Sequence, residues 1–147
     1  MEKRLAIQNH FPDAYRLMKE LDGLINNSGI NPLHLELIKI RASQINGCAY
    51  CLNLHNTDAA RLGEALGKLY VMSAWREAPN WFTEEEVILL RLTEEVTQIQ
   101  QHGISDEVFN RGIELFGEGK FAHLIMAAIS INSWNRVAIG LKMHPRK

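Results

Sequence analysis

The sequence has no long apolar run and no excess of charge of either sign. No stretch approaches the roughly 20 apolar residues that a helix needs to span a bilayer. The net charge is −1 over 147 residues, which removes any bulk electrostatic attraction to nucleic acid or to an anionic membrane. The N-terminal segment lacks the apolar core and the small-residue cleavage site of a signal peptide. We therefore expect a cytoplasmic protein with neither a nucleic-acid nor a membrane partner.

Cysteine is scarce, and both cysteines of the chain, Cys48 and Cys51, fall in one C-x-x-C motif. In a reducing compartment such a pair is more often catalytic or metal-binding than part of a structural disulfide framework. His55 follows the motif closely, and Glu36 precedes it. These four residues are the candidate site.

The sequence is also poor in the alternating Val, Ile and Thr runs that are typical of strands. Apolar residues recur instead at the spacing of helices. Hydrophobic residues make up 46% of the chain and charged residues 22%, which is ordinary for one globular domain. We predict a single all-α domain over residues 1–147, with seven helices at about 12–27, 32–45, 48–63, 64–76, 83–101, 105–117 and 120–142.

The predicted helices at 32–45 and 120–142 are apolar on most of their sides. Within the second of them, we interpret Trp134, Asn135 and Arg136 as core packing with a structural ion pair, not as substrate contacts. A helix that is apolar all round has to be covered on all sides. In a chain this short, part of that cover can come from a second subunit, so we expect a homo-oligomer.

Cys48, Cys51 and His55 share one face of the predicted helix at 48–63. At about 100° per residue, they fall within an arc of roughly 60°. Residues three apart on a helix have Cβ atoms about 5–6 Å apart, and small adjustments bring two cysteines at that spacing into disulfide range. A helix start favours the thiolate, because its free N–H groups and its dipole carry positive charge. One sulfur can then attack an electrophile while the other resolves the product, and His55 fits the role of base.

Glu36 lies on a largely apolar surface of its predicted helix. A carboxylate there is either paired or has a raised pKa, and either state can serve acid–base catalysis. Spacing alone leaves other interpretations open: a buried salt bridge from Glu36 to Arg41 or Arg136, an ordinary helix histidine at His55, and a C-x-x-C that arose by chance or is half of a zinc site. A closed zinc site needs a fourth ligand, which Glu36 or His34 would have to supply.

The order Glu36, C-x-x-C, His55 resembles the signature of the alkylhydroperoxidase D-like (AhpD-like) proteins of the carboxymuconolactone decarboxylase superfamily. The flanking text RASQINGCAYCLNLHNTDAARLG is similar to the core of that family, and FTEEEVILLRLTEEVT, ISDEVF and AISINSWNRVAIGL resemble its continuation. The resemblance covers about residues 33–141. It implies an all-helical fold that assembles into trimers or hexamers, and peroxidase activity that depends on the cysteine pair.

By position, the resemblance gives Cys51 the role of peroxidatic thiol and Cys48 that of resolving thiol. Glu36 and His55 take the role of proton relay. We expect Cys48 to be the more exposed sulfur, since it lies nearer the helix tip.

In one departure from the family pattern, Tyr50 stands where the best-studied branch has a histidine, and a phenol is a poor proton shuttle at neutral pH. Decarboxylase members of the superfamily lack the cysteine pair, so its presence argues against lactone decarboxylation.

We therefore predict a thiol-dependent alkyl hydroperoxide reductase for antioxidant defence, with a redox-active disulfide and with no cofactor or metal. Its partners would be a hydroperoxide substrate and an external dithiol of the lipoyl or thioredoxin type. The alternative with the same chemistry is a dithiol–disulfide oxidoreductase or redox sensor without significant peroxidase turnover. A binding or assembly module with incidental thiols is an alternative of a different class.

Overall fold

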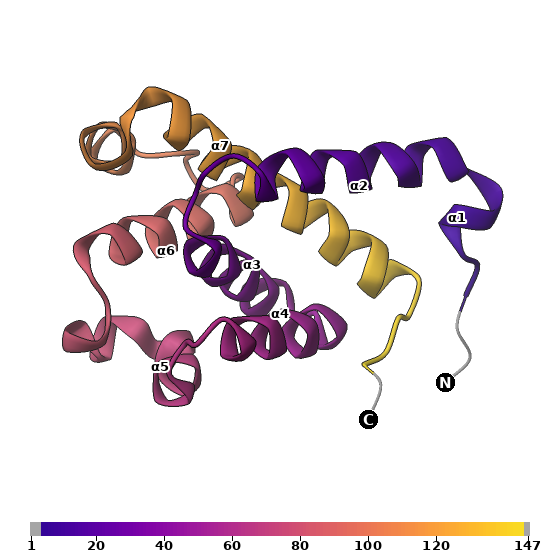
Figure 1. Ribbon diagram of the computed structural model, residues 1–147, viewed down its shortest axis with the longest axis horizontal. Helices are drawn as coiled ribbons and strands as arrows, with labels where there is room; N and C mark the ends of the chain where they lie inside the picture. Colours follow the sequence, from indigo (N-terminus) through magenta and orange to yellow (C-terminus); the bar gives the residue numbers. More distant parts are fainter. Residues whose placement is uncertain (1–3, 146–147) are drawn as a thin grey trace.

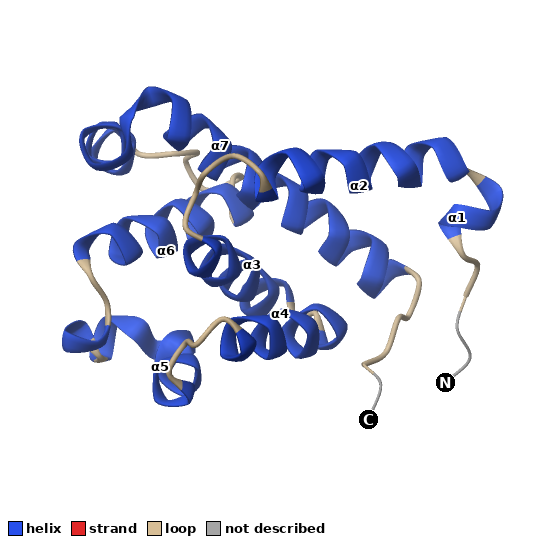
Figure 2. Ribbon diagram, in the orientation of Figure 1, coloured by secondary structure: helices blue, strands red, loops and turns tan. Residues whose placement is uncertain are grey.

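Helices account for all the regular structure of residues 4–145, which are the residues that the computed structural model describes. Figure 2 shows these helices joined by short loops. The prediction of an all-α fold is confirmed. The elements are α1 (Ile7–His10), α2 (Pro12–Asn26), α3 (Pro32–Asn46), α4 (Ala49–Arg61), α5 (Leu66–Val71), the 3₁₀ helices η1 (Met72–Glu77) and η2 (Pro79–Trp81), α6 (Glu84–Thr97) and α7 (Asp106–Gly140).

Helix starts lie where capping residues predict them. The Asn31 side chain accepts a hydrogen bond from the Leu33 N–H at 3.0 Å, and Pro32 occupies the first position of α3, where its missing N–H has no cost. Thr83 and Glu86 form a reciprocal capping box at the start of α6. These ends depend only on neighbours along the chain, which is why the sequence locates them.

Three elements differ from the sequence-based prediction. The short helix α1 was not predicted. The helix predicted at 64–76 is divided: α5 ends at Val71, and the chain continues from Met72 as the 3₁₀ helix η1, within which Ala74 leaves helical geometry (φ −118°, ψ 34°). The helices predicted at 105–117 and 120–142 are the two arms of α7, which meet at a sharp break at Gly117 (φ 76°, ψ 157°). No helix among residues 4–145 combines the length and the apolar character that crossing a membrane requires.

α3 forms the centre of the fold, with α4, α6 and α7 around it (Figure 1). Leu35, Ile38 and Ala42 pack on one side of it, with core residues of α6 and α7. Leu37 and Ile40 pack on another side, with residues of α5, α6 and η1. α3 is thus covered within the subunit and needs no partner for that purpose. α7, by contrast, leaves large apolar side chains partly exposed, namely Phe109, Met126, Ile129 and Ile139.

The break at Gly117 folds the first arm of α7 back onto the second. A Cβ atom added to Gly112 would lie 2.1 Å from Cε2 of the Phe121 ring, which is itself buried. Gly112→Ala should therefore lower the free energy of unfolding by about 1–3 kcal/mol, as overpacked cores do. The midpoint of urea unfolding measures this change.

Gly119→Ala is the matched control for that prediction, since the added methyl group would meet nothing within 4 Å beyond the neighbouring residues and backbone of its own helix. Alanine has the higher helix propensity, so this variant should keep or gain stability, by up to about 1 kcal/mol. Equal stability of the two variants would show that Phe121 moves aside without cost.

Candidate active site

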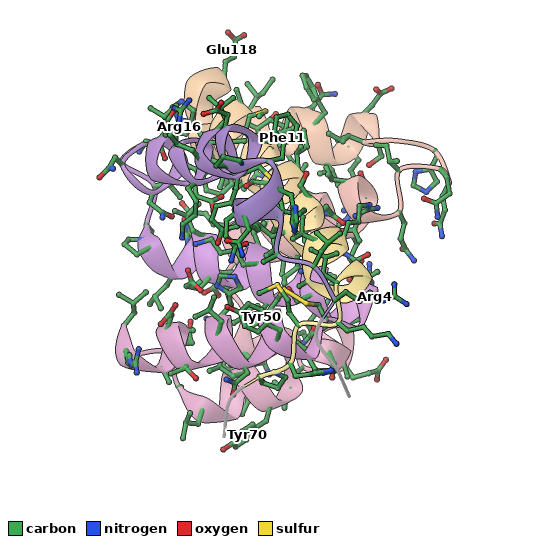
Figure 3. All side chains as sticks on the ribbon, turned by 90° about the vertical axis from the view of Figure 1, so that its right-hand side faces the viewer. Arg4, Phe11, Arg16, Tyr50, Tyr70 and Glu118 are labelled. Carbon is green, nitrogen blue, oxygen red and sulfur yellow. A yellow bond between two sulfur atoms is a disulfide. The ribbon has the colours of Figure 1, made fainter. Side chains whose placement is uncertain are left out.

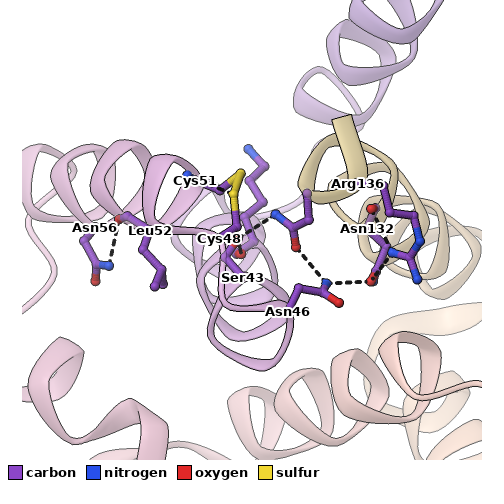
Figure 4. Close-up of a disulfide and its surroundings, with 10 residues drawn as sticks. Ser43, Asn46, Cys48, Cys51, Leu52, Asn56, Asn132 and Arg136 are labelled. Atoms are coloured by element: carbon purple, nitrogen blue, oxygen red, sulfur yellow. Dashed lines mark hydrogen bonds between the residues drawn. A yellow bond between two sulfur atoms is a disulfide. The ribbon is translucent and has the colours of Figure 1, made fainter. Parts of the chain in front are cut away.

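The two cysteines are bonded to each other at the junction of α3 and α4 (Figure 4). Their Cα atoms are 5.4 Å apart. Gly47 ends α3 in the left-handed conformation (φ 71°), a geometry that glycine adopts without strain. Cys48 follows as the N-cap residue of α4, and its Sγ accepts a hydrogen bond from the Cys51 N–H at 3.3 Å. The cysteine pair thus lies at a helix start, as its position after the Asn46–Gly47 turn predicts.

Both sulfurs are nearly inaccessible. Cys48 is 1% exposed and Cys51 is 4% exposed. The expectation that Cys48 is the more exposed cysteine is wrong, because the turn that carries it packs against α7, where both cysteines belong to one buried cluster with Ala138. Cys51, one turn further along, lines a cavity instead. An external molecule therefore meets Cys51 first.

Glu36 and His55 are in direct contact across the interface between α3 and α4. Oε2 of Glu36 lies 2.8 Å from Nδ1 of His55. The other carboxylate oxygen accepts a hydrogen bond from Nζ of Lys39, also at 2.8 Å. Glu36 thus forms a buried salt bridge, but its partner is Lys39. The two partners suggested by the sequence, Arg41 and Arg136, bond to other residues. Arg41 pairs with Glu94, and Arg136 donates to Asn132.

Glu36 is 7% exposed, and the surroundings of its carboxyl group determine the charge of that group. Burial alone would raise its pKa, but the hydrogen bond with His55 and the charge of Lys39 outweigh burial and hold the pKa below its ordinary value. An ionised carboxylate only accepts hydrogen bonds. In a neutral His55 the proton is therefore on Nδ1, and Nε2 carries the lone pair that can accept a proton.

A cavity of about 170 Å³ lies beside Cys51 and His55. α4 contributes Tyr50, Cys51 and His55 to its wall, and most of the remaining wall is apolar and comes from α2, α7 and the N-terminal segment. An engineered apolar cavity of about 150 Å³ holds a benzene molecule. The space next to Cys51 is thus large enough for a compact apolar group.

Trp134 forms part of the cavity wall through contacts that the sequence does not indicate. Its Nε1 donates to Oδ2 of Asp22 at 2.7 Å, and the Ser130 hydroxyl donates to the other oxygen at 2.6 Å. The Tyr15 ring meets the indole edge-on, with centroids 5.4 Å apart. The interpretation of Trp134 as core packing is therefore incomplete, and no structural ion pair forms at Arg136 among the described residues. No sequence pattern indicates Asp22 as a partner of Trp134, because the two residues are 112 positions apart.

Comparison with known proteins places this arrangement in a family. The model of the carboxymuconolactone decarboxylase family matches residues 12–95. The chain belongs to this family. The resemblance to its AhpD-like members, inferred from the motif residues, is confirmed.

Similar proteins extend the comparison over the whole chain. An uncharacterized protein of Bacillus subtilis (strain 168), YdfG, is 35% identical over 141 residues, which are 96% of this chain and 95% of that protein. A crystal structure from Agrobacterium tumefaciens has a TM-score of 0.93 and 33% identity, and the match covers 99% of this chain and 100% of that chain. That protein is of unknown function and has been suggested to be the antioxidant defence protein AhpD. A peroxidase-related protein from Silicibacter sp. TM1040 shares the fold, with a TM-score of 0.78 at 19% identity over 95% of this chain and 81% of that chain.

The zinc alternative finds little support in this AhpD-like site. One group of three possible metal ligands occurs among the described residues: Glu36, His55 and Asp58, with ligand atoms within 4.8 Å of one another. Neither cysteine belongs to it, and the Lys39 ammonium group already neutralises the Glu36 carboxylate. Zinc sites that use a C-x-x-C need both sulfurs as ligands, whereas here the sulfurs bind each other.

In this AhpD-like protein the N-terminal segment closes one side of the cavity. Residues 5–8 line the cavity, and α1 has no buried residue. Two hydrogen bonds fasten the segment to the end of α7: the Arg4 N–H donates to the Leu141 carbonyl at 3.3 Å, and Arg4 Nη1 donates to the Gly140 carbonyl at 3.0 Å. In Figure 3 the Cys48–Cys51 disulfide is visible in the region between two labelled residues, Arg4 of this segment and Tyr50 of α4. We call residues 4–8 the strap.

Deleting the chain up to Gln8 should speed reduction of the disulfide by a protein thiol. The two hydrogen bonds of the strap are together worth about 1–3 kcal/mol, which corresponds to a rate increase of roughly 5- to 150-fold. Stopped-flow measurement with a thioredoxin gives this rate. A small dithiol should gain much less, because it reaches Cys51 through a narrower opening. If the deletion raised the rate of disulfide reduction equally for both reductants, a steric role for the strap would be contradicted.

Proposed function

We propose that this AhpD-like protein is a thiol-dependent reductase of organic hydroperoxides that serves antioxidant defence. The observation that carries the proposal is the 2.8 Å contact between Glu36 of α3 and His55 of α4. His55 and Cys51 lie on the same helix and line the same cavity. A thiol nucleophile needs a base within reach, and the base needs a third group to orient it. Cys51, His55 and Glu36 supply these three functions.

The first step is the attack of Cys51 on the peroxide. His55 Nε2 accepts the proton of the Cys51 thiol, while Glu36 holds the imidazole through Nδ1 and stabilises its charged form. The thiolate attacks the terminal oxygen of the hydroperoxide and the O–O bond breaks. The alkoxide leaves with the proton from His55, so that the products are an alcohol and the sulfenic acid of Cys51.

The second step forms the disulfide that the structure contains. The Cys48 thiolate attacks the sulfur of the Cys51 sulfenic acid, and hydroxide leaves as water with the proton that Cys48 gave up. Both steps together transfer two electrons from the cysteine pair to the peroxide. The N-cap position of Cys48 supports its role as resolving thiol, because the Cys51 N–H donates to its sulfur and favours the thiolate.

An external dithiol restores the reduced pair in the third step. It attacks one sulfur of the disulfide, forms a mixed disulfide, and leaves oxidised when its second thiol displaces the protein. We propose a reductant of the lipoyl or thioredoxin type, in the cytoplasm. We also propose a homo-oligomer, a trimer or a hexamer, in which the exposed apolar residues of α7 are covered.

Tyr50 has no part in this relay. It lines the cavity and packs with the cysteines, but the Glu36–His55 contact connects the acid–base groups without it. Proton transfer in this branch therefore runs through Glu36 and His55, with water as a further carrier.

Steady-state peroxide consumption with dihydrolipoamide or a thioredoxin as reductant tests the proposal. The value of kcat/KM should be at least about tenfold higher for cumene hydroperoxide than for hydrogen peroxide, because each CH₂ group buried in the cavity contributes about 0.8 kcal/mol. Disulfide exchange with the reductant but no consumption of either peroxide would favour the alternative, a dithiol–disulfide oxidoreductase or redox sensor.

A further inference from the structure

Three asparagine side chains connect the turn before Cys48 to α7 (Figure 4). Nδ2 of Asn46 donates to Oδ1 of Asn132 at 2.9 Å and to Oδ1 of Asn135 at 2.8 Å. Nδ2 of Asn135 in turn donates to the Ser43 hydroxyl at 3.0 Å. We call Asn46, Asn132 and Asn135 the amide cluster.

Asn132 and Asn135 of the amide cluster are buried, Asn46 is half-buried, and their side-chain hydrogen bonds are satisfied. Asn135 has 0% exposure and Asn132 has 8%. Nδ2 of Asn132 donates to the Thr97 hydroxyl at 2.9 Å and to the Ala128 carbonyl at 2.8 Å, and its Oδ1 also accepts from Arg136 at 3.1 Å. Such a network has one low-energy arrangement, since a broken bond leaves a buried polar group unpaired.

The amide cluster reaches Cys48 by two short routes. Asn46 is the last residue of α3 and is separated from Cys48 only by Gly47. The Ser43 hydroxyl accepts the hydrogen bond from Nδ2 of Asn135, and the Ser43 carbonyl accepts a hydrogen bond from the Cys48 N–H at 3.0 Å. The backbone on the N-terminal side of Cys48 is thus tied to α7, independently of the disulfide.

We propose that Asn46 and Asn135 are positioning residues for the resolving cysteine. In the reduced protein no covalent bond holds Cys48 near Cys51, so the turn alone determines how often the two sulfurs meet. The amide cluster keeps Cys48 at the N-cap of α4, within bonding distance of its partner. It thereby raises the effective concentration of one sulfur at the other, which stabilises the disulfide and speeds its formation.

Loss of this positioning should have two measurable effects. The disulfide becomes easier to reduce, because a lower effective concentration of Cys48 lowers the equilibrium constant of ring closure. The sulfenic acid of Cys51 also lives longer, and a second peroxide molecule can oxidise it to the sulfinic acid before Cys48 arrives. The second effect rests on the proposed function, whereas the first concerns only the thiol–disulfide equilibrium.

Asn46→Ala and Asn46→Leu test the inference without replacing a fully buried residue. Alanine removes the amide and leaves space, and leucine removes the amide at similar volume. In both variants the equilibrium constant for disulfide formation against glutathione should fall about tenfold, which corresponds to a reduction potential about 30 mV higher. The fraction of sulfinic acid after excess cumene hydroperoxide, measured by mass spectrometry, should rise in both.

Asn56→Ala is the matched control, because within residues 4–145 the Nδ2 of Asn56 donates only to the Leu52 carbonyl of the same helix, at 2.8 Å. It should keep the wild-type potential and sulfinic fraction. Urea midpoints of the oxidised proteins establish that each variant is folded. Folded Asn46 variants with the wild-type glutathione equilibrium would overturn the inference, as would an equal shift in Asn56→Ala. If the wild type consumes no peroxide, the proposed function fails while the glutathione experiment still decides the role of the amide cluster.

Discussion

Replacing Cys51 with serine should reduce hydroperoxide consumption by at least about 10³-fold, as expected when a nucleophile is lost. A serine hydroxyl at this position is not ionised near neutral pH and cannot attack the O–O bond. Cys48→Ser should behave differently, because Cys51 still reacts once and then stops as a sulfenic or sulfinic acid. Single-turnover peroxide assays separate the two variants.

Mass spectrometry of the wild type is the control for this comparison. Stoichiometric peroxide should remove two hydrogens, and the loss should map to the peptide that contains Cys48 and Cys51. A Cys51→Ser protein that still turns over hydroperoxide, next to an inactive Cys48→Ser protein, would reverse the two roles. The burial of Cys48 and the position of Cys51 in the cavity wall argue against that reversal.

Glu36→Gln should lower kcat/KM for hydroperoxide by about 10²–10⁴-fold, the range typical for loss of an acid–base group. The neutral amide keeps the shape of the side chain. It removes the negative charge that orients His55 and stabilises the imidazolium ion during proton transfer. Steady-state kinetics at neutral pH measures this loss, and the circular dichroism of the variant checks the fold.

Glu36→Gln should also change how the stability of the folded protein depends on pH. The pKa of Glu36 is lowered in the folded protein, so its ionisation stabilises the fold above the unfolded value of about 4.3, and this contribution is lost as the pH falls below that value. The difference in urea midpoint between the wild type and Glu36→Gln should therefore be largest at neutral pH and shrink toward pH 3.

Glu118→Gln is the control for this pH series, because Glu118 is exposed at the tip of the molecule (Figure 3) and forms no ion pair among the described residues. It should leave the urea midpoint close to that of the wild type at every pH. A Glu36→Gln difference that stays constant down to pH 3 would show that the ionised carboxylate does not stabilise the fold.

Local chemistry explains what could be predicted from the sequence. The capping residues Asn31 and Thr83 start helices through contacts a few positions away, so their pattern is sufficient evidence. The cysteine pair and His55 lie on one helix, and helical geometry alone brings them to one face. Glu36 could be singled out as a carboxylate on an apolar helix surface, but only the resemblance to AhpD-like proteins gave it a relay role shared with His55, which lies on another helix.

Contacts between distant segments explain what could not be predicted. The carboxylate of Asp22 orients Trp134 from another helix, and the strap reaches the cavity from the start of the chain. Packing decides the relative exposure of Cys48 and Cys51, and helix position gave the wrong order. Lys39 is the exception: it lies one turn from Glu36, and an i, i+3 rule would have identified it.

The near-complete burial of both cysteines has a consequence for the proposed peroxidase cycle, because it favours small reactants over large ones. A hydroperoxide is small enough to enter the cavity, whereas a protein reductant must first displace the strap. If the protein is the proposed peroxidase, we therefore expect oxidation of the pair to be faster than its regeneration, so that the oxidised form accumulates when peroxide is abundant. Its output in the cell would follow the supply of reducing equivalents rather than the supply of peroxide.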